Sequence, residues 1–151
     1  IDNVSSPVTI RNTTIVGNTA GESGTAVASQ GGAILVKSDT GTKKLTMLNC
    51  IIADNTTVNT NKTVQLSYAG GVDYCLFDIA DDLLGTNSTS GDPLFTNAAK
   101  HNYHLGEGSP AIHAGVTYEG IGTDLDDVAF AATPSMGCYE KQRFATVIVV
   151  R

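Results

Sequence analysis

A repeated block in the first half of the chain limits the folds that this sequence can adopt. Residues 8–20 (VTIRNTTIVGNTA) align with residues 45–57 (LTMLNCIIADNTT) without a gap. The identical pairs are Thr9/Thr46, Asn12/Asn49, Ile15/Ile52, Asn18/Asn55 and Thr19/Thr56. Because internal repeats build structures by stacking one unit on the next, the alignment predicts that the two blocks lie side by side.

Each block consists of two short runs of β-forming residues interrupted at an Asn. Neither block has helical periodicity, so we expect two strands that meet at a corner. Asn suits the corner because it tolerates the left-handed backbone region, and its amide can bond to the main chain or to an identical amide in the next unit. Stacked units would set Asn12 beneath Asn49 as a structural Asn stack.

A third strand is predicted where the Gly pair 31–32 precedes the apolar run 33–36. A further unit is predicted over 64–79, in which Cys75 follows a turn position as Cys50 does. Short strands that advance one sheet spacing per turn form a solenoid, whose inward apolar side chains stack into one core.

The character of the sequence changes in its second half. Pro93 and Pro110 interrupt regular ladders there because proline lacks a backbone donor. An open solenoid end exposes its core and unpaired backbone, so a cap is required. We therefore expect residues 1–90 to form the last coils, and residues 91–151 to form a C-terminal cap and terminal strand. Ile1 begins in the middle of the pattern, which predicts further coils upstream.

Several motifs follow one another in the second half. They are Asp92-Pro93-Leu94-Phe95, Tyr103-His104-Leu105, Ser109-Pro110-Ala111-Ile112-His113-Ala114-Gly115, the Asp-rich loop 124–128, and Met136-Gly137-Cys138-Tyr139-Glu140. In this order they resemble the C-terminal region of bacterial surface proteins of the pectate-lyase-like superfamily, often labelled "choice-of-anchor Q". The resemblance implies an all-β fold, a right-handed parallel β-helix (solenoid) whose terminal coils end in an irregular cap. His113 departs from the family pattern, which usually has Asp there, and the loop lacks the Gly and Arg that commonly follow its first Asp.

The resemblance also implies a function. It suggests a non-catalytic terminal or capping portion of a larger extracellular or cell-surface protein that binds or processes carbohydrate. The alternative is a part of a polysaccharide lyase or glycoside hydrolase that acts on acidic polysaccharide, with most catalytic residues upstream. The expected partners are a polysaccharide and the upstream coils of the parent chain.

Composition argues against two classes of partner. The formal net charge is -6, and the nine Lys and Arg are scattered apart from Lys43 and Lys44, so no basic patch is available for nucleic acid or anionic membranes. The strand-like tail 144–150 contains the longest strongly apolar run, and it is far shorter than the roughly 18 residues of a membrane span. We expect this tail to be paired or covered. The chain begins without Met or a basic and apolar leader, so no signal peptide of its own is predicted.

Two groups of aspartates could offer oxygen ligands to calcium. The first is Asp124, Asp126 and Asp127, and the second is Asp78, Asp81 and Asp82. The first group lacks the Gly and Glu spacing of an EF-hand loop. Lyases of the superfamily that the chain resembles often use calcium to bind uronates. Solvated loop carboxylates are the alternative for both groups, so no cofactor is assigned and calcium is the only candidate.

Basic residues bear on the lyase alternative. Polysaccharide β-elimination needs a base at the C5 proton and a cation for the uronate carboxylate. Lys43 and Lys44 lie on a loop entering a strand, where a substrate could reach them, and solvated lysines are the alternative. Arg11 and Lys62 are further basic residues of the coils. No pattern identifies the pair of facing carboxylates that glycoside hydrolysis requires.

The histidines and cysteines are interpreted as structural. His101 and His104 lie on an extended segment and should point to different sides, which argues against a metal pair. His113 is expected to be a hydrogen-bonded residue of the cap. The cysteines have no Cys-x-x-Cys spacing and are expected to be small buried thiols. They are Cys50, Cys75 and Cys138.

Overall fold

The computed structural model describes residues 8–20, 32–36, 45–57, 64–66, 69–78 and 85–141. Regular structure in these residues is all β, apart from one 3-10 turn, η1 (Ala98–Lys100). The strands are β1 (Val8–Arg11), β2 (Thr14–Val16), β3 (Thr19–Ala20), β4 (Ile34–Val36), β5 (Leu45–Leu48), β6 (Ile51–Ala53), β7 (Thr56–Thr57), β8 (Val64–Leu66), β9 (Ala69–Asp73), β10 (Leu76–Phe77), β11 (Thr89–Ser90), β12 (Phe95–Asn97) and β13 (Asn102–Leu105).

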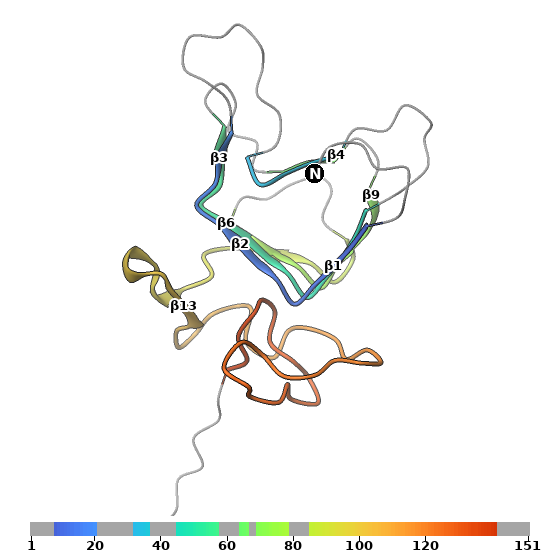
Figure 1. Ribbon diagram of the computed structural model, residues 1–151, viewed down its shortest axis with the longest axis vertical. Coiled ribbons are helices and arrows are strands. Elements are labelled where there is room, and N and C mark those ends of the chain that lie inside the picture. Colours follow the sequence, from blue (N-terminus) through green and yellow to red (C-terminus); the bar gives the residue numbers. More distant parts are fainter. Residues whose placement is uncertain are drawn as a thin grey trace, which may run out of the picture.

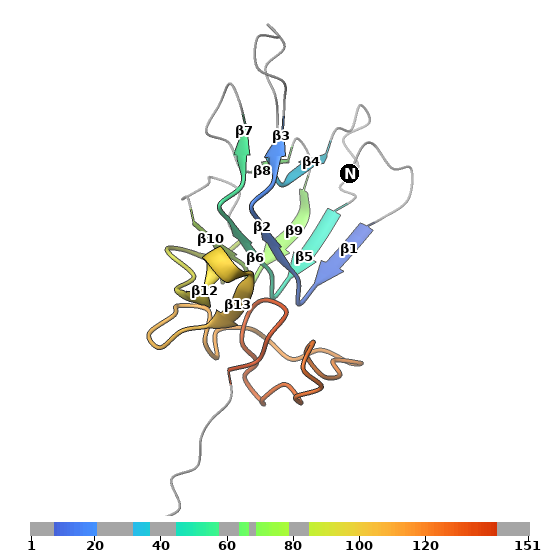
Figure 2. The same ribbon diagram turned by 60° about the vertical axis from the view of Figure 1, so that its left-hand side comes forward.

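Strands β1 to β11 form parallel sheets by pairing each repeat with the next (Figures 1 and 2). The sheet orders are β1-β5-β9, β2-β6-β10-β11, β3-β7 and β4-β8. Val8 pairs with Leu45 and Thr19 pairs with Thr56, so one offset of 37 residues holds along the whole block. The ungapped sequence alignment is therefore confirmed as the pairing register. We call β1–β4 the first repeat, β5–β8 the second repeat and β9–β10 the third repeat.

The predicted third strand is confirmed over Ile34–Val36. The predicted unit 64–79 is confirmed only in part, because β8 pairs with β4 and closes the second repeat, and the third repeat begins at β9. Strand β4 pairs with β8 from Ile34 opposite Val64. Leu76 lies opposite Ile51, which puts Cys75 in the same position of its repeat as Cys50. Strand β11 then adds a short fourth level to the β2-β6-β10 sheet, which we call the middle sheet.

The corner between the first and second strand of each repeat has a left-handed backbone. Its φ angle is 44° at Asn12, 54° at Asn49 and 49° at Tyr74. Asn adopts this conformation at little cost because its short polar side chain bonds locally, whereas Tyr is strained there. The corner thus explains why Asn recurs in two of the three repeats.

The interior of the repeats is one apolar core. Its buried members come from all three repeats and are Ile34, Leu45, Met47, Cys50, Ile52, Val72, Cys75 and Phe77. Side chains alternate across each strand, so every second residue of a paired strand reaches this interior. Stacking of equivalent positions makes the core continuous from one repeat to the next.

A second apolar cluster, which we call the outer cluster, covers the outer face of the middle sheet. Ile51, Ala53 and Leu76 point away from the interior and are nevertheless at most 1% exposed. Their cover comes from Leu105, Ala111 and Met136 in the second half of the chain. The central strands β6 and β10 are therefore buried on both faces, which accounts for the unbroken apolar run of β6.

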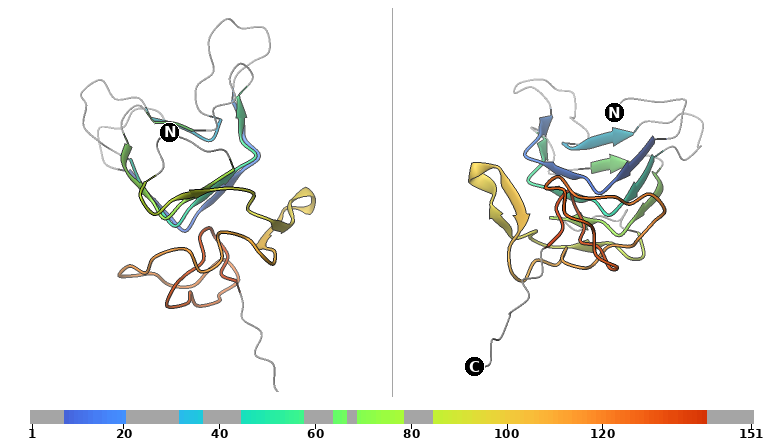
Figure 3. Two further views of the ribbon diagram at one scale, coloured as in Figure 1. Left: turned by 180° about the vertical axis from the view of Figure 1, so that it is seen from behind. Right: turned by 60° about the horizontal axis from the view of Figure 1, so that its bottom comes forward.

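Residues 109–140, which we call the lateral segment, lie along the outside of the corner between β1 and β2, rather than across an end of the stack (Figures 1 and 3). The Gly137 N–H donates to the Asn49 carbonyl over 2.8 Å, and the Cys138 N–H donates to Thr14 Oγ1 over 3.1 Å. The sequence predicts a cap over the open end for this part of the chain, so its placement differs from expectation. The physical reason is the apolar outer face of the middle sheet, which this segment removes from water.

The lateral packing predicts a steric effect at Gly137. A Cβ atom there would lie 2.7 Å from Ile51 Cδ1 and 2.8 Å from Thr14 Oγ1. We expect Gly137→Ala to lower the free energy of unfolding by about 1–3 kcal/mol more than Gly120→Ala does. Gly120→Ala is the control. Both glycines have positive φ, so both substitutions strain the backbone, but a Cβ at Gly120 meets no atom within 4 Å and adds no steric clash. Chemical denaturation of the two variants measures the difference, and equal losses would contradict the packing.

Candidate functional site

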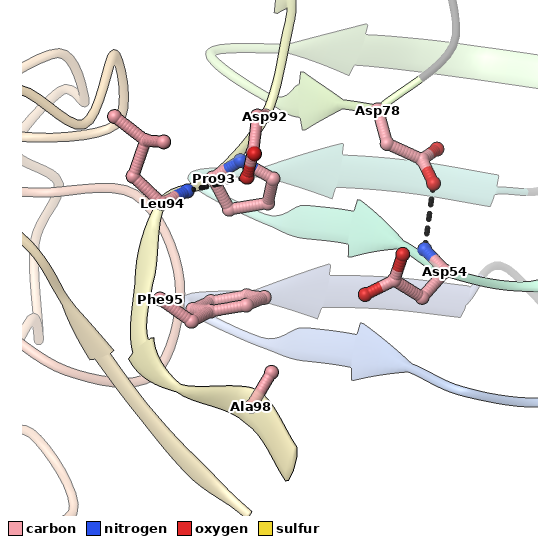
Figure 4. A pocket seen from close by; sticks show the side chains of 7 residues that line it. All are labelled: Asp54, Asp78, Asp92, Pro93, Leu94, Phe95 and Ala98. Carbon is pink, nitrogen blue, oxygen red and sulfur yellow. Dashed lines mark hydrogen bonds between the residues drawn. The ribbon is translucent and has the colours of Figure 1, made fainter.

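A groove opens at one edge of the middle sheet, where its strands end (Figure 4). It has a volume of about 390 Å³ and is lined by Asp54, Asp78, Asp92, Pro93, Leu94, Phe95 and Ala98. We call these residues the acidic groove. The described lining includes three carboxylates and no Lys or Arg, so these residues give the groove negative charge.

The aspartates meet because each comes soon after a strand of the same parallel sheet. Asp54 follows β6 directly, Asp78 follows β10 directly, and Asp92 comes two residues after β11. Neighbouring parallel strands run in one direction, so their carboxyl ends share one edge of the sheet. The Asp54 N–H donates to Asp78 Oδ2 over 2.6 Å and ties the second repeat to the third.

A tight turn supplies the apolar wall of the groove. Asp92 Oδ1 accepts the N–H of Leu94 over 2.8 Å, which closes the turn around Pro93. Phe95 follows, and its ring lies beside the carboxylates in Figure 4. This ring packs edge to face against Tyr103, with centroids 5.2 Å apart and planes at 76°. Leu94 is 41% exposed at the rim.

Two of the carboxylates have acceptor capacity left. Asp54 is exposed, and its carboxylate bonds to no described residue. Asp78 is half-buried, and its Oδ1 atom is shielded from solvent without a hydrogen-bond partner. A shielded oxygen that lacks a donor costs about 1–3 kcal/mol. A ligand with hydroxyl or amine donors would recover part of that cost.

The predicted calcium residues have separate roles and do not converge. Asp124 is buried, and its two oxygens accept three backbone N–H groups over 2.8–2.9 Å, one of them from Glu140. Asp126 Oδ2 lies 2.6 Å from His104 Nε2. Asp127 is exposed in a left-handed turn with φ 61°. Within the described ranges, no group of three or more His, Cys, Asp or Glu side chains could hold a metal ion.

The described residues include only some of the other charged candidates. Asp78, from the second predicted acidic group, lines the acidic groove. Several candidates lie outside the described residues: Asp81, Asp82, Lys43, Lys44 and Lys62. The Arg11 guanidinium lies 4.6 Å from the centre of the Tyr118 ring, in a cation–π contact far along the chain from its own repeat.

Asn12 and Asn49 occupy equivalent corners, and their amides bond to the second half of the chain. Asn49 Nδ2 donates to the Val116 carbonyl over 2.8 Å, and Asn49 Oδ1 accepts the Val116 N–H over 2.9 Å. Asn12 Oδ1 accepts the Tyr118 hydroxyl over 2.8 Å. For Asn49, therefore, the main-chain alternative is the one observed, and the corner amides hold the lateral segment against two repeats.

An amide ladder forms at the next corner instead, between Asn18 and Asn55. The Asn18 amide and backbone N–H both donate to Asn55 Oδ1, over 2.9 and 3.0 Å. Asn55 Nδ2 donates in turn to the Ile15 carbonyl over 2.8 Å. The signal for this ladder was present in the aligned sequence, where both positions are Asn.

The histidines have structural neighbours, and His101 and His104 point to different ones. His101 stacks on Tyr103 with ring centroids 6.3 Å apart, whereas His104 stacks on Tyr139 at 4.0 Å. This arrangement agrees with the expectation that the two side chains point to different sides. His113 Nδ1 lies 3.2 Å from a backbone carbonyl in the lateral segment, as expected of a hydrogen-bonded residue.

The chain was also compared with known proteins. No family model matches it, and no curated protein matches it significantly. Across the part of the chain that the structure describes, no helix has the length and apolar character needed to cross a membrane. The acidic groove itself is therefore the basis for inferring a function.

The bonding of Asp124 predicts a structural rather than a calcium-dependent effect. Asp124→Asn should lower the free energy of unfolding by about 1–3 kcal/mol, because the new amide nitrogen cannot accept the Glu140 N–H. Asp127→Asn is the control and should change it by less than about 0.5 kcal/mol, since Asp127 is exposed. Denaturation is followed with calcium and with a chelator. A loss that appears only in calcium would favour a metal site.

Proposed function

We propose that the chain forms the terminal coils of a right-handed parallel β-helix in a larger extracellular or cell-surface bacterial protein. Consecutive repeats pair in parallel around a shared core, which is how a solenoid is built. Connections between parallel strands of one sheet are right-handed in nearly all proteins, which supports the handedness. The motifs between Asp92 and Glu140 support the surface location through their resemblance to the pectate-lyase-like superfamily.

The first repeat supports the presence of further coils. The inward residues of β1 and β2 are half-buried, whereas their partners in the second repeat are at most 1% exposed. The pairs are Val8 and Leu45, Ile10 and Met47, and Ile15 and Ile52. Among the described strands, β1 and β2 lie at sheet edges. A coil stacked on them would bury these side chains and pair the free ladder.

The acidic groove supports carbohydrate binding as the function of this part of the protein. The observation that carries the proposal is the grouping of Asp54, Asp78 and Asp92 beside the ring of Phe95. Carboxylates accept strong hydrogen bonds from sugar hydroxyls, and an aromatic ring covers the apolar C–H face of a sugar. Concave sites that combine an apolar wall with a few polar groups are typical of small-ligand recognition.

The charge of the groove favours a neutral glycan. A uronate would bring a further carboxylate close to three aspartates, and like charges at short range repel. Among the residues that the structure describes, no basic side chain lines the groove, and Arg11 contacts Tyr118 elsewhere. The lyase alternative would therefore need its cationic groups from outside the described residues, either in this chain or in the remainder of the parent protein.

Glycoside hydrolysis is a second candidate for the same groove. It requires two carboxyl groups that flank the scissile bond, one as acid and one as base or nucleophile. Asp54 and Asp78 are adjacent carboxylates on neighbouring repeats. Asp78 is half-buried and Asp54 is exposed, so the two carboxyl groups have different environments. Reducing ends released from a bound neutral glycan would assign hydrolysis, and binding without release would assign recognition.

The glycan proposal predicts a charge-specific loss at Asp54. Cello-, xylo- and manno-oligosaccharides are titrated calorimetrically into the chain, with oligogalacturonate as the acidic comparison. We expect a neutral oligosaccharide to bind and Asp54→Asn to weaken it about tenfold, which corresponds to about 1.4 kcal/mol. Oligogalacturonate should not bind.

Asp127→Asn is the matched control. Both aspartates are exposed and both have positive φ, which Asn tolerates, so each change removes one charge without new strain. The control should leave the dissociation constant unchanged. The proposal is rejected if no neutral oligosaccharide binds, or if the two variants weaken binding equally.

A further inference from the structure

Two cysteines occupy equivalent positions in neighbouring repeats. Cys50 directly precedes β6 and Cys75 directly precedes β10, and these strands pair from Ile51 opposite Leu76. The Leu76 N–H donates to the Cys50 carbonyl over 2.8 Å, so the ladder is intact beside both cysteines. Both side chains point into the interior core and are 0% exposed.

Their spacing suits a covalent link. Neighbouring strands in a sheet lie about 4.8 Å apart, and disulfides form across Cα separations of about 4.4–6.8 Å. Both cysteines are free thiols here, and each donates to a backbone carbonyl, Cys50 Sγ to Leu48 over 3.3 Å and Cys75 Sγ to Asp73 over 3.2 Å. The neighbouring Cys75 thiol lowers the pKa of Cys50 against the opposing effect of burial, and Cys50 together with burial raises the pKa of Cys75.

We propose that Cys50 and Cys75 are a disulfide site that joins the second and third repeats inside the core. The third cysteine is not part of it. Cys138 belongs to the lateral segment on the outside of the corner, where its N–H bonds to Thr14. The register of the repeats therefore selects one of the three pairings that the sequence allows.

The chemistry requires an oxidant, and a low-molecular-weight disulfide supplies it. One cysteine thiolate attacks a sulfur of the oxidant and releases one small thiol. The second cysteine thiolate then attacks the mixed disulfide and releases the other small thiol. Two protein thiols are oxidised, one small disulfide is reduced, and the two protons pass to the released thiolates. Because the folded core shields both sulfurs, the exchange takes place in the partly folded chain.

The experiment is oxidative refolding of the whole chain. Reduced, unfolded protein is refolded in a mixture of oxidised and reduced glutathione, free thiols are alkylated, and the protein is digested with trypsin without reduction. Cleavage at Lys44, Lys62, Lys100 and Lys141 puts each cysteine in its own peptide, namely 45–62, 63–100 and 101–141. We expect 45–62 linked to 63–100, and 101–141 alkylated. Cys50 and Cys75 both alkylated, or linked to Cys138, overturns the proposal.

Thermal unfolding gives a second measurement. Reduction should lower the midpoint of the wild-type protein by on the order of 10 °C, as for a loop of this length in a domain of this size. Cys138→Ala should keep both the link and the shift, whereas Cys75→Ala should lose both. If Cys75→Ala fails to fold, the wild-type peptide map still decides. A shift on reduction that Cys138→Ala abolishes would also overturn the pairing.

Discussion

The hydrogen-bonded register between residues 8–20 and 45–57 determines which side chains share the interior and which face outward. A slip of one residue would turn every inward side chain to the opposite face. Identical pairs such as Asn18 with Asn55 and Thr19 with Thr56 make contacts that form only in this register. The interior core, the outer cluster and the edge that carries the acidic groove all follow from it.

The middle sheet shows how this constraint extends to the second half of the chain. Its outward residues are apolar, so the register that buries Ile52 inside also presents Ile51 and Leu76 outside. That outer face needs a cover, and the lateral segment provides it. Polar contacts then fix the position of the cover, because the corner amides of Asn12 and Asn49 bond to residues 116–118.

Much of the repeat was predictable, because equal spacing and identical residues carry the register in the sequence itself. The lateral placement of residues 109–140 was not predictable. Nothing in the sequence around Gly137 or Val116 indicates that these residues contact Asn49, which is far away in the chain. The acidic groove was missed for a related reason. Asp54 and Asp78 are 24 residues apart and Asp78 and Asp92 are 14 residues apart, so their common edge of the sheet is not a regular sequence motif. The available signal was that each comes directly or almost directly after a strand.

The groove depends on both the interior core and the apolar cluster on the outer face of the middle sheet. Asp54 and Asp78 are fixed by the strands that pack the interior, whereas Phe95 belongs to the outer cluster with Leu105 and Met136. The short turn held by Asp92 joins these two supports. A loosened lateral segment would therefore move the aromatic wall while leaving the carboxylates in register. The affinity of the proposed glycan site would therefore depend on the packing of the second half through one side of the groove, although no residue of the lateral segment is among its described lining.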